Sequence, residues 1–172
     1  LPTVSSADRS RVDERPFEEF RTLLQRLYPA VHANCTSERI GPTGVLYKWK
    51  GKCSSAPVVL MAHYDVVPVE EDRWAHPPFC AEIIDGELWG RGTLDTKVTL
   101  LGVMEAAEKL IGEGFVPSND IYMAFSGDEE IAGDSAPAIV RVLEERGVIP
   151  AFVLDEGGAI VDKVFPGVAN PI

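Results

Sequence analysis

Residues 57–68 read PVVLMAHYDVVP, and this stretch decides the fold that the sequence predicts. Its first half, PVVLMA at residues 57–62, is a short continuous apolar run, which is typical of a strand covered on both faces. A histidine and an acid, His63 and Asp65, follow the run at once. The stretch therefore predicts a buried strand whose carboxyl end carries polar side chains.

The same pattern recurs twice further along the chain. IYMAF (residues 121–125) and AFVL (residues 151–154) are apolar runs that predict two more buried strands. Glu129 and Glu130 come shortly after the first run, and Asp155 comes directly after the second. Each of the three predicted strands therefore ends in side chains that bind cations well.

Helical patterns separate these strands. Apolar residues recur at intervals of three and four over residues 17–27 and 96–111, which predicts two amphipathic helices, the first ended by Pro29. A third helix is predicted over residues 136–146, and a further strand over residues 44–49. Strands that alternate with helices indicate an α/β protein. The predicted fold is a three-layer αβα sandwich around a mixed, mostly parallel sheet.

Composition excludes several kinds of partner. Sixteen basic residues against 27 acidic ones give a net charge of −11, whereas nucleic-acid binding needs Lys and Arg to neutralise phosphates. No apolar run approaches the roughly 18 residues of a membrane span, and the first residues lack the apolar core of a signal peptide. Three widely spaced cysteines favour reduced thiols. We expect no nucleic-acid or membrane partner and a cytoplasmic protein.

The polar residues at the strand ends are expected to meet. In open α/β sheets the carboxyl ends of parallel strands share one edge, and Asp95 arrives there from the start of the second helix. Taken alone, Asp95 is explained as a helix N-cap, and His63 as a hydrogen-bonded, half-buried histidine. Several carboxylates at one edge repel one another unless protons or cations compensate them. The pattern as a whole favours a metal site over these separate structural roles.

Five longer motifs carry a family resemblance. They are HYDVVP (63–68), WAHPPF (74–79), GELWGRGTLDTK (86–97), SGDEE (126–130) and LDEGG (154–158). In this order and spacing they resemble the M20 metallopeptidases, most closely the carboxypeptidase S-like and N-acyl-amino-acid hydrolase branch. The sequence departs from the pattern after Lys97, where many relatives carry a glycine. The resemblance implies that residues 1–172 are the N-terminal portion of the catalytic domain. A lid or dimerisation domain and a returning segment with a last histidine ligand are then absent.

The resemblance also implies roles for individual residues. It implies two zinc ions, with cobalt or manganese as alternatives in a carboxylate-rich site. The implied metal ligands are His63, Asp95, Glu130 and Asp155, and Asp95 would bridge the two ions. Asp65 would orient the imidazole of His63, and Glu129 would be the general base.

The implied activity is zinc-dependent hydrolysis of peptide or N-acyl-amino-acid amide bonds by metal-activated water. Its substrate would be a small peptide or an N-acyl amino acid. Without the last histidine the 172 residues are expected to be inactive by themselves, so the alternative is a non-catalytic fragment or interaction module that keeps the motifs. A phosphoesterase is disfavoured, because no Arg or Lys cluster suits phosphate. The oligomeric state stays open, with a homodimer among the options.

Overall fold

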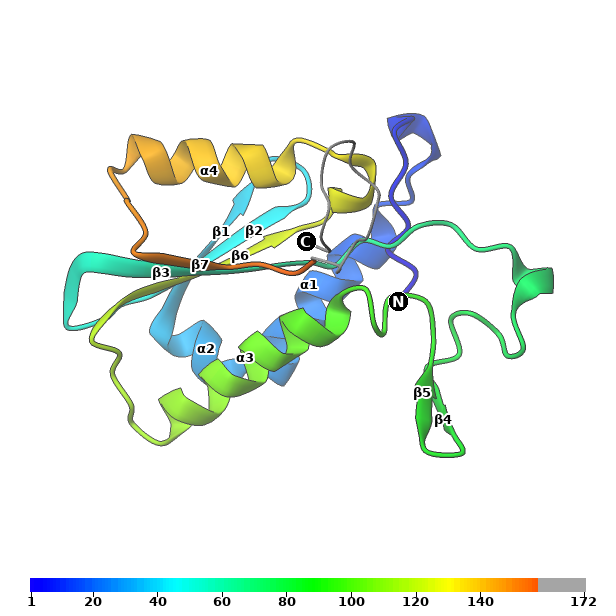
Figure 1. Ribbon diagram of the computed structural model, residues 1–172, viewed down its shortest axis with the longest axis horizontal. Helices are drawn as coiled ribbons and strands as arrows, with labels where there is room; N and C mark the ends of the chain where they lie inside the picture. Colours follow the sequence, from blue (N-terminus) through cyan, green and yellow to red (C-terminus); the bar gives the residue numbers. More distant parts are fainter. Residues whose placement is uncertain (158–172) are drawn as a thin grey trace, which may run out of the picture.

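A five-stranded mixed sheet forms the middle layer of the structure, a computed structural model that describes residues 1–157 (Figure 1). The strands lie in the order β1-β2-β6-β3-β7. Their bounds are Cys35–Ile40 for β1, Gly44–Trp49 for β2, Cys53–His63 for β3, Asn119–Ser126 for β6 and Phe152–Leu154 for β7. Strand β2 pairs antiparallel with β1 and β6, whereas β3 pairs parallel with β6 and β7.

Helices cover both faces of this sheet. Figure 1 shows α1 (Arg15–Leu27), α2 (Pro29–Asn34) and α3 (Lys97–Gly112) on one side, and α4 (Ser135–Glu145) on the other. The predicted three-layer α/β class with a mixed sheet is confirmed. Two of the four strand pairings are parallel, fewer than expected, because β1 and β2 form a hairpin at one edge.

The first helix forms where the apolar spacing predicts it. Phe17, Phe20 and Leu24 lie on one face of α1 and are buried in the core. Pro29 ends this helix as expected, but it also begins a second helix, α2, which the apolar pattern does not predict. Proline is well tolerated at the first helical position, since the N–H that it lacks has no partner there. The chain bends between the two helices at Tyr28.

Strand β6 lies at the centre of the sheet and contributes to both sides of the core. Met123 and Phe125 pack in the cluster formed with α1, α2 and α3, whereas Tyr122 and Ala124 pack against α4. All four side chains are buried. The prediction of a strand covered on both faces is confirmed here.

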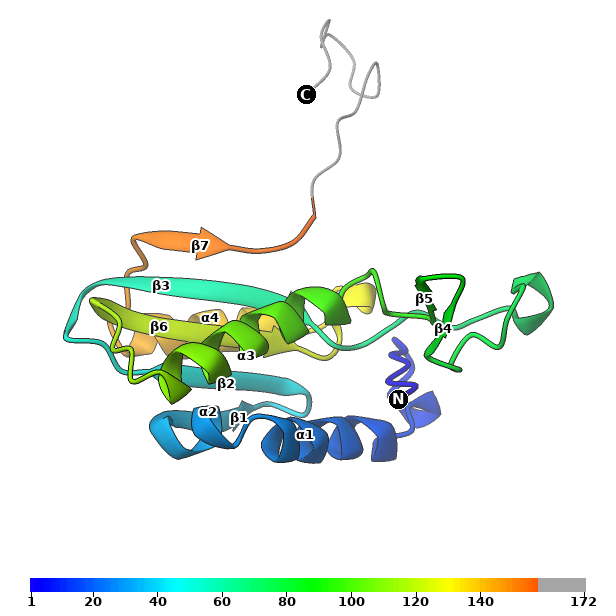
Figure 2. The same ribbon diagram turned by 90° about the horizontal axis from the view of Figure 1, so that it is seen from below.

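A strand forms near residues 151–154 as predicted, but the prediction that it is buried is wrong. Strand β7 forms, but Phe152, Val153 and Leu154 are 53%, 49% and 50% exposed. Figure 2 shows β7 at the edge of the sheet, beyond β3. An apolar run predicts a strand, but it does not distinguish the centre of a sheet from its edge.

The long stretch between β3 and α3 lies beyond the carboxyl ends of β3 and β7 (Figure 1). It contains a short 3₁₀ helix (Glu71–Arg73) and a hairpin of β4 (Glu82–Ile84) and β5 (Glu87–Trp89). Such a long connection is typical of a functional loop. In the described part of the chain, no helix has the length and apolar character needed to cross a membrane.

Candidate metal centre

Three parallel strands bring their carboxyl ends to one edge of the sheet. His63, the last residue of β3, lies opposite Ser126, the last residue of β6. On the other side of β3, Leu60 lies opposite Leu154 at the end of β7. The residues that follow these strands therefore emerge side by side, as expected for an α/β sheet.

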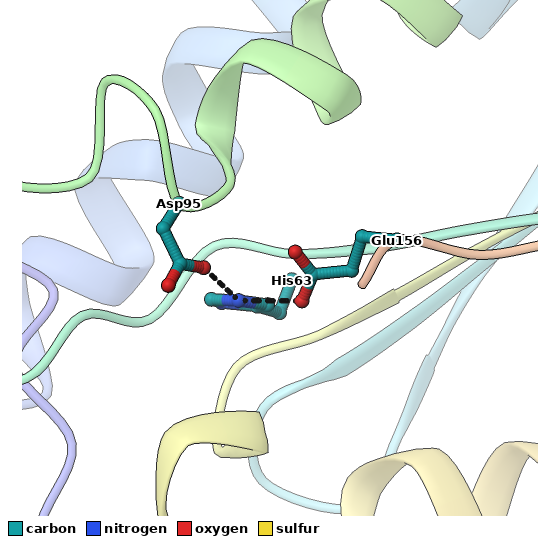
Figure 3. Close-up of side chains that lie close together, drawn as sticks. All are labelled: His63, Asp95 and Glu156. Atoms are coloured by element: carbon teal, nitrogen blue, oxygen red, sulfur yellow. Dashed lines mark hydrogen bonds and ion pairs between the residues drawn. The ribbon is translucent and has the colours of Figure 1, made fainter. Parts of the chain in front are cut away.

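His63 lies where the acidic side chains converge (Figure 3). Its imidazole is buried, and its Nε2 atom lies 3.0 Å from Asp95 Oδ1 and 3.0 Å from Glu156 Oε1. Glu129 Oε2 is 3.7 Å from the same nitrogen. Ligand atoms of His63, Asp95 and Glu156 all lie within 4.8 Å of one another. One imidazole nitrogen and several carboxylate oxygens thus meet at a single point.

Asp95 reaches this point from just before α3. Thr96, not Asp95, is the N-cap residue of the helix, and no side chain makes a capping hydrogen bond there. The N-cap explanation of Asp95 is therefore wrong. Its side chain is 64% exposed and faces His63, which leaves part of the carboxylate open to solvent.

Asp65 supports the other side of the imidazole. Its carboxylate is completely buried, and Oδ1 lies 3.3 Å from His63 Nδ1. The same carboxylate accepts the backbone N–H groups of Glu129, at 3.1 Å, and Glu130, at 3.2 Å. A partner at Nδ1 directs the other ring nitrogen, Nε2, toward the acidic cluster. Asp65 thus fixes the histidine and the Glu-Glu pair relative to each other.

Tyr64, between His63 and Asp65, anchors this segment in the core. Its ring stacks on Phe20, its backbone N–H donates to Ser126, and its hydroxyl donates to the carbonyl of Thr43 at 2.5 Å. Gly127 passes close to this ring, since a Cβ atom there would lie 2.8 Å from Tyr64 Cζ. Neither residue is predicted from the sequence as part of the site, although Tyr64 lies inside the motif HYDVVP and Gly127 inside SGDEE.

The electrostatics of the cluster reflect crowded negative charge. Burial alone would lower the pKa of His63, but the carboxylates of Asp65, Glu156 and Glu129 outweigh it and raise that pKa to about 9. Burial raises the pKa of Glu130, and the carboxylate of Asp95 raises it further. Burial also raises the pKa of Glu156. The carboxylates therefore stabilise positive charge at this point.

This donor set fits a divalent cation. Catalytic zinc sites use three protein ligands, drawn from His, Cys and carboxylates, and keep one position open for water. The cluster offers one histidine nitrogen and two carboxylate oxygens. In residues 1–157, no Lys or Arg forms a salt bridge with Asp95, Glu129 or Glu156. A cation would therefore compensate charge that the protein itself leaves largely unbalanced.

Two of the predicted ligands lie differently from His63 and Asp95. Glu130 is tied to Asp65 through its backbone, and its carboxylate is not among the three clustered groups. Asp155 is exposed and accepts the N–H of Glu156, whereas the carboxylate of Glu156 faces His63. Neighbours in an extended chain project to opposite sides, so only one of these two acids faces the imidazole at a time. The roles of Glu130 and Asp155 as ligands stay predictions, and Glu156 was not predicted.

Comparison with known proteins identifies the family. The model of Peptidase family M20/M25/M40 matches residues 59–169. The chain belongs to this peptidase family. It is 38% identical to the probable carboxypeptidase S-like 2 of Dictyostelium discoideum, over 99% of this chain and 34% of that protein. It is 37% identical to the N-fatty-acyl-amino acid synthase/hydrolase PM20D1 of Xenopus tropicalis, over 100% of this chain and 34% of that protein. The chain thus spans about a third of the length of these relatives.

A solved structure agrees with the fold. The M20 family metallo-carboxypeptidase Sso-CP2 from Sulfolobus solfataricus superposes with a TM-score of 0.70 at 19% sequence identity. The match covers 92% of this chain and 36% of that one. The layered sheet described above is therefore the fold of an M20 catalytic domain.

Proposed function

We propose that this site hydrolyses amide bonds of small peptides or N-acyl amino acids, within a longer protein of which residues 1–172 are a part. The observation that carries the proposal is the convergence of His63, Asp95 and Glu129 at the carboxyl edge of the sheet. Relatives named carboxypeptidase S-like and N-fatty-acyl-amino acid synthase/hydrolase support this class of bond. The metallo-carboxypeptidase with the same fold supports a metal-dependent reaction.

The proposed cofactor is a pair of zinc ions. When bound, such ions lower the pKa of water and polarise a carbonyl group. We propose four ligands from this chain, with Asp95 shared between the ions; they are His63, Asp95, Glu130 and Asp155. A carboxylate suits the shared position because each of its two oxygens can bind one cation.

The chain's own residues then perform the remaining work. His63 Nδ1 donates a hydrogen bond to the backbone carbonyl of Asp65 at 3.1 Å and lies 3.3 Å from its carboxylate, which keeps Nε2 free as a ligand. Glu129 accepts a proton from the attacking water and passes it to the nitrogen of the leaving amine. Its carboxylate is suitably placed, because it lies 3.7 Å from the ligand nitrogen of His63 and is 51% exposed. A substrate amide can reach it from solvent.

The proposal is tested by removing the shared carboxylate from the full-length protein. In Asp95→Asn we expect zinc binding and hydrolysis of an N-acyl amino acid and a dipeptide to be lost together. Asp85→Asn is the matched control, since Asp85 is exposed between β4 and β5, in a hairpin that projects away from the sheet (Figure 1). Zinc content by atomic emission and initial rates are measured on both. Full hydrolysis by Asp95→Asn would exclude the proposed site.

A further inference from the structure

The start of the chain is built into the support of the site. Residues 3–5 run parallel to the segment that follows β3, with Val4 bridged to Val66. Val66 donates its N–H to the carbonyl of Thr3 at 2.9 Å, and Ser5 donates its N–H to the carbonyl of Val66 at 3.1 Å. In Figure 1 this dark blue stretch runs beside the loop after β3. Backbone hydrogen bonds from residues 3–5 therefore hold the residue directly after Asp65.

The side chain of Thr3 holds the backbone directly before Asp65. Thr3 is completely buried, and its hydroxyl donates a hydrogen bond to the carbonyl of Tyr64. That carbonyl belongs to the peptide group that joins Tyr64 to Asp65. The N–H of Tyr64 is bound to Ser126 at 2.9 Å. The Thr3 hydroxyl thus fixes the orientation of the Tyr64–Asp65 peptide group, and the end of β6 fixes the peptide group directly before it.

Ser5 holds the segment on the other side of Asp65, since its N–H binds the carbonyl of Val66. It is only 4% exposed, and its hydroxyl oxygen makes no hydrogen bond within residues 1–157. Ser5 thus acts through its backbone, which holds the residue directly after Asp65.

These contacts fix the position of Asp65. Its carboxylate lies against His63 Nδ1 and accepts the N–H groups of Glu129 and Glu130. A rotation of the Tyr64–Asp65 peptide group would move the carboxylate away from all three partners. Contacts on both sides of Asp65 resist that rotation.

We propose that Thr3 and Ser5 are positioning residues, which act through Asp65 to hold His63 and the Glu129–Glu130 pair in register. The inference rests on the proposed function, because it assigns His63 and Glu129 their roles. It adds to the site a supporting segment, residues 3–5, that lies far from His63 in the sequence. It also explains why two polar side chains at the start of the chain are buried at the edge of the sheet.

The test uses three variants of the full-length protein. Thr3→Val keeps the shape of the side chain and removes its hydroxyl, whereas Thr3→Ser keeps the hydroxyl. Thr36→Val is the matched control, since Thr36 is exposed on β1 at the far edge of the sheet from β7. For each variant we measure zinc affinity by chelator competition, kcat and KM. Hydrogen exchange of the Glu129 and Glu130 amides is measured on zinc-stripped protein.

We expect Thr3→Val to weaken zinc affinity about 10-fold, the lower end of what loss of an outer support costs a metal site. It should lower kcat more than it raises KM, and it should speed exchange of the two amides about 10-fold. Thr3→Ser and Thr36→Val should resemble the wild type. Wild-type affinity and exchange in Thr3→Val, or equal losses in Thr3→Ser, would overturn the inference.

The exchange measurement separates the two proposals. If the wild type neither binds zinc nor hydrolyses an amide, the proposed function fails. Faster exchange in Thr3→Val, rescued in Thr3→Ser, would still show that Thr3 positions the Glu129–Glu130 backbone. Unchanged exchange beside an active, zinc-binding wild type would reject the positioning role alone.

Discussion

At the scale of single residues, His63 is the centre of the site. Its Nε2 atom contacts Asp95 and Glu156, while its Nδ1 atom contacts Asp65. The sequence predicts this convergence from strand ends, since parallel strands deliver their last residues to one edge. It does not predict Glu156, because the direction of a side chain beyond the last paired residue depends on local backbone angles. Two consecutive acids, Asp155 and Glu156, were the only available signal.

The first prediction separates the general base from the ligand in the full-length protein. Glu129→Gln should abolish hydrolysis and leave zinc bound, because an amide does not accept the proton and Glu129 is not a proposed ligand. Glu130→Gln should lose zinc as well as activity. Both substitutions keep the backbone N–H groups that Asp65 accepts, so the support of the site is matched. Zinc content by atomic emission and steady-state rates are measured on both variants. Equal zinc loss in the two would contradict the assignment of Glu129 as base and Glu130 as ligand.

The second prediction concerns the pair after β7. We expect Asp155→Asn to lose zinc and Glu156→Gln to keep it, because Asp155 comes directly after the paired strand and has the shorter, more rigid side chain. Glu156 has the longer side chain and can leave His63 at little cost.

Zinc content and affinity of both variants are compared with the wild type. The opposite order, with zinc lost only in Glu156→Gln, would mean that the contact between Glu156 and His63 is the ligand geometry. In that case the ligand implied by the family resemblance would be wrong for this chain.

At the scale of elements, the regular pattern of apolar residues predicts most of the helices and strands. Strand β2 begins and ends where predicted, and α3 buries Leu100, Met104 and Ala107 as its spacing requires. The short helix α2 and the β4–β5 hairpin were not predicted, because a six-residue helix and three-residue strands are too short to show a period. The burial of β7 was predicted wrongly, since it depends on neighbours that a local pattern does not contain.

The third prediction concerns the turn between β6 and the 3₁₀ helix Glu129–Ile131. A Cβ atom at Gly127 would lie 2.8 Å from Tyr64 Cζ and 2.9 Å from Thr43 Cβ, and these neighbours are buried. Gly127→Ala should therefore destabilise the protein by about 1–3 kcal/mol, the usual effect of overpacking. It should also lower zinc affinity, because the turn carries Glu129 and Glu130.

Gly102→Ala is the control for this substitution. Gly102 lies inside α3, and a Cβ atom there would meet nothing within 4 Å. Alanine should stabilise the helix by about 0.5–1 kcal/mol. Thermal unfolding of both variants gives the comparison, and a melting temperature of Gly127→Ala at or above that of the wild type would show that Tyr64 and the turn are not packed as described.

At the scale of the whole molecule, the net charge of −11 and the acidic cluster fit a protein that binds cations rather than phosphates. The chain belongs to the M20 peptidase family but spans about a third of its relatives. The family resemblance implies one histidine ligand in addition to the four residues proposed from this chain. We therefore expect residues 1–172 alone to bind zinc weakly and to show no turnover, since one ion would have only two protein ligands from this chain.

The most direct test of the central claim is a zinc titration of the metal-stripped full-length protein, with hydrolysis of an N-acyl amino acid followed at each addition. Two-metal sites need both ions for full activity. We predict no hydrolysis in stripped protein and recovery that is complete at about two zinc ions per chain. Hydrolysis that persists after stripping, or zinc that binds at the site without restoring it, would contradict the assignment of this strand edge as a metal-dependent amidohydrolase centre.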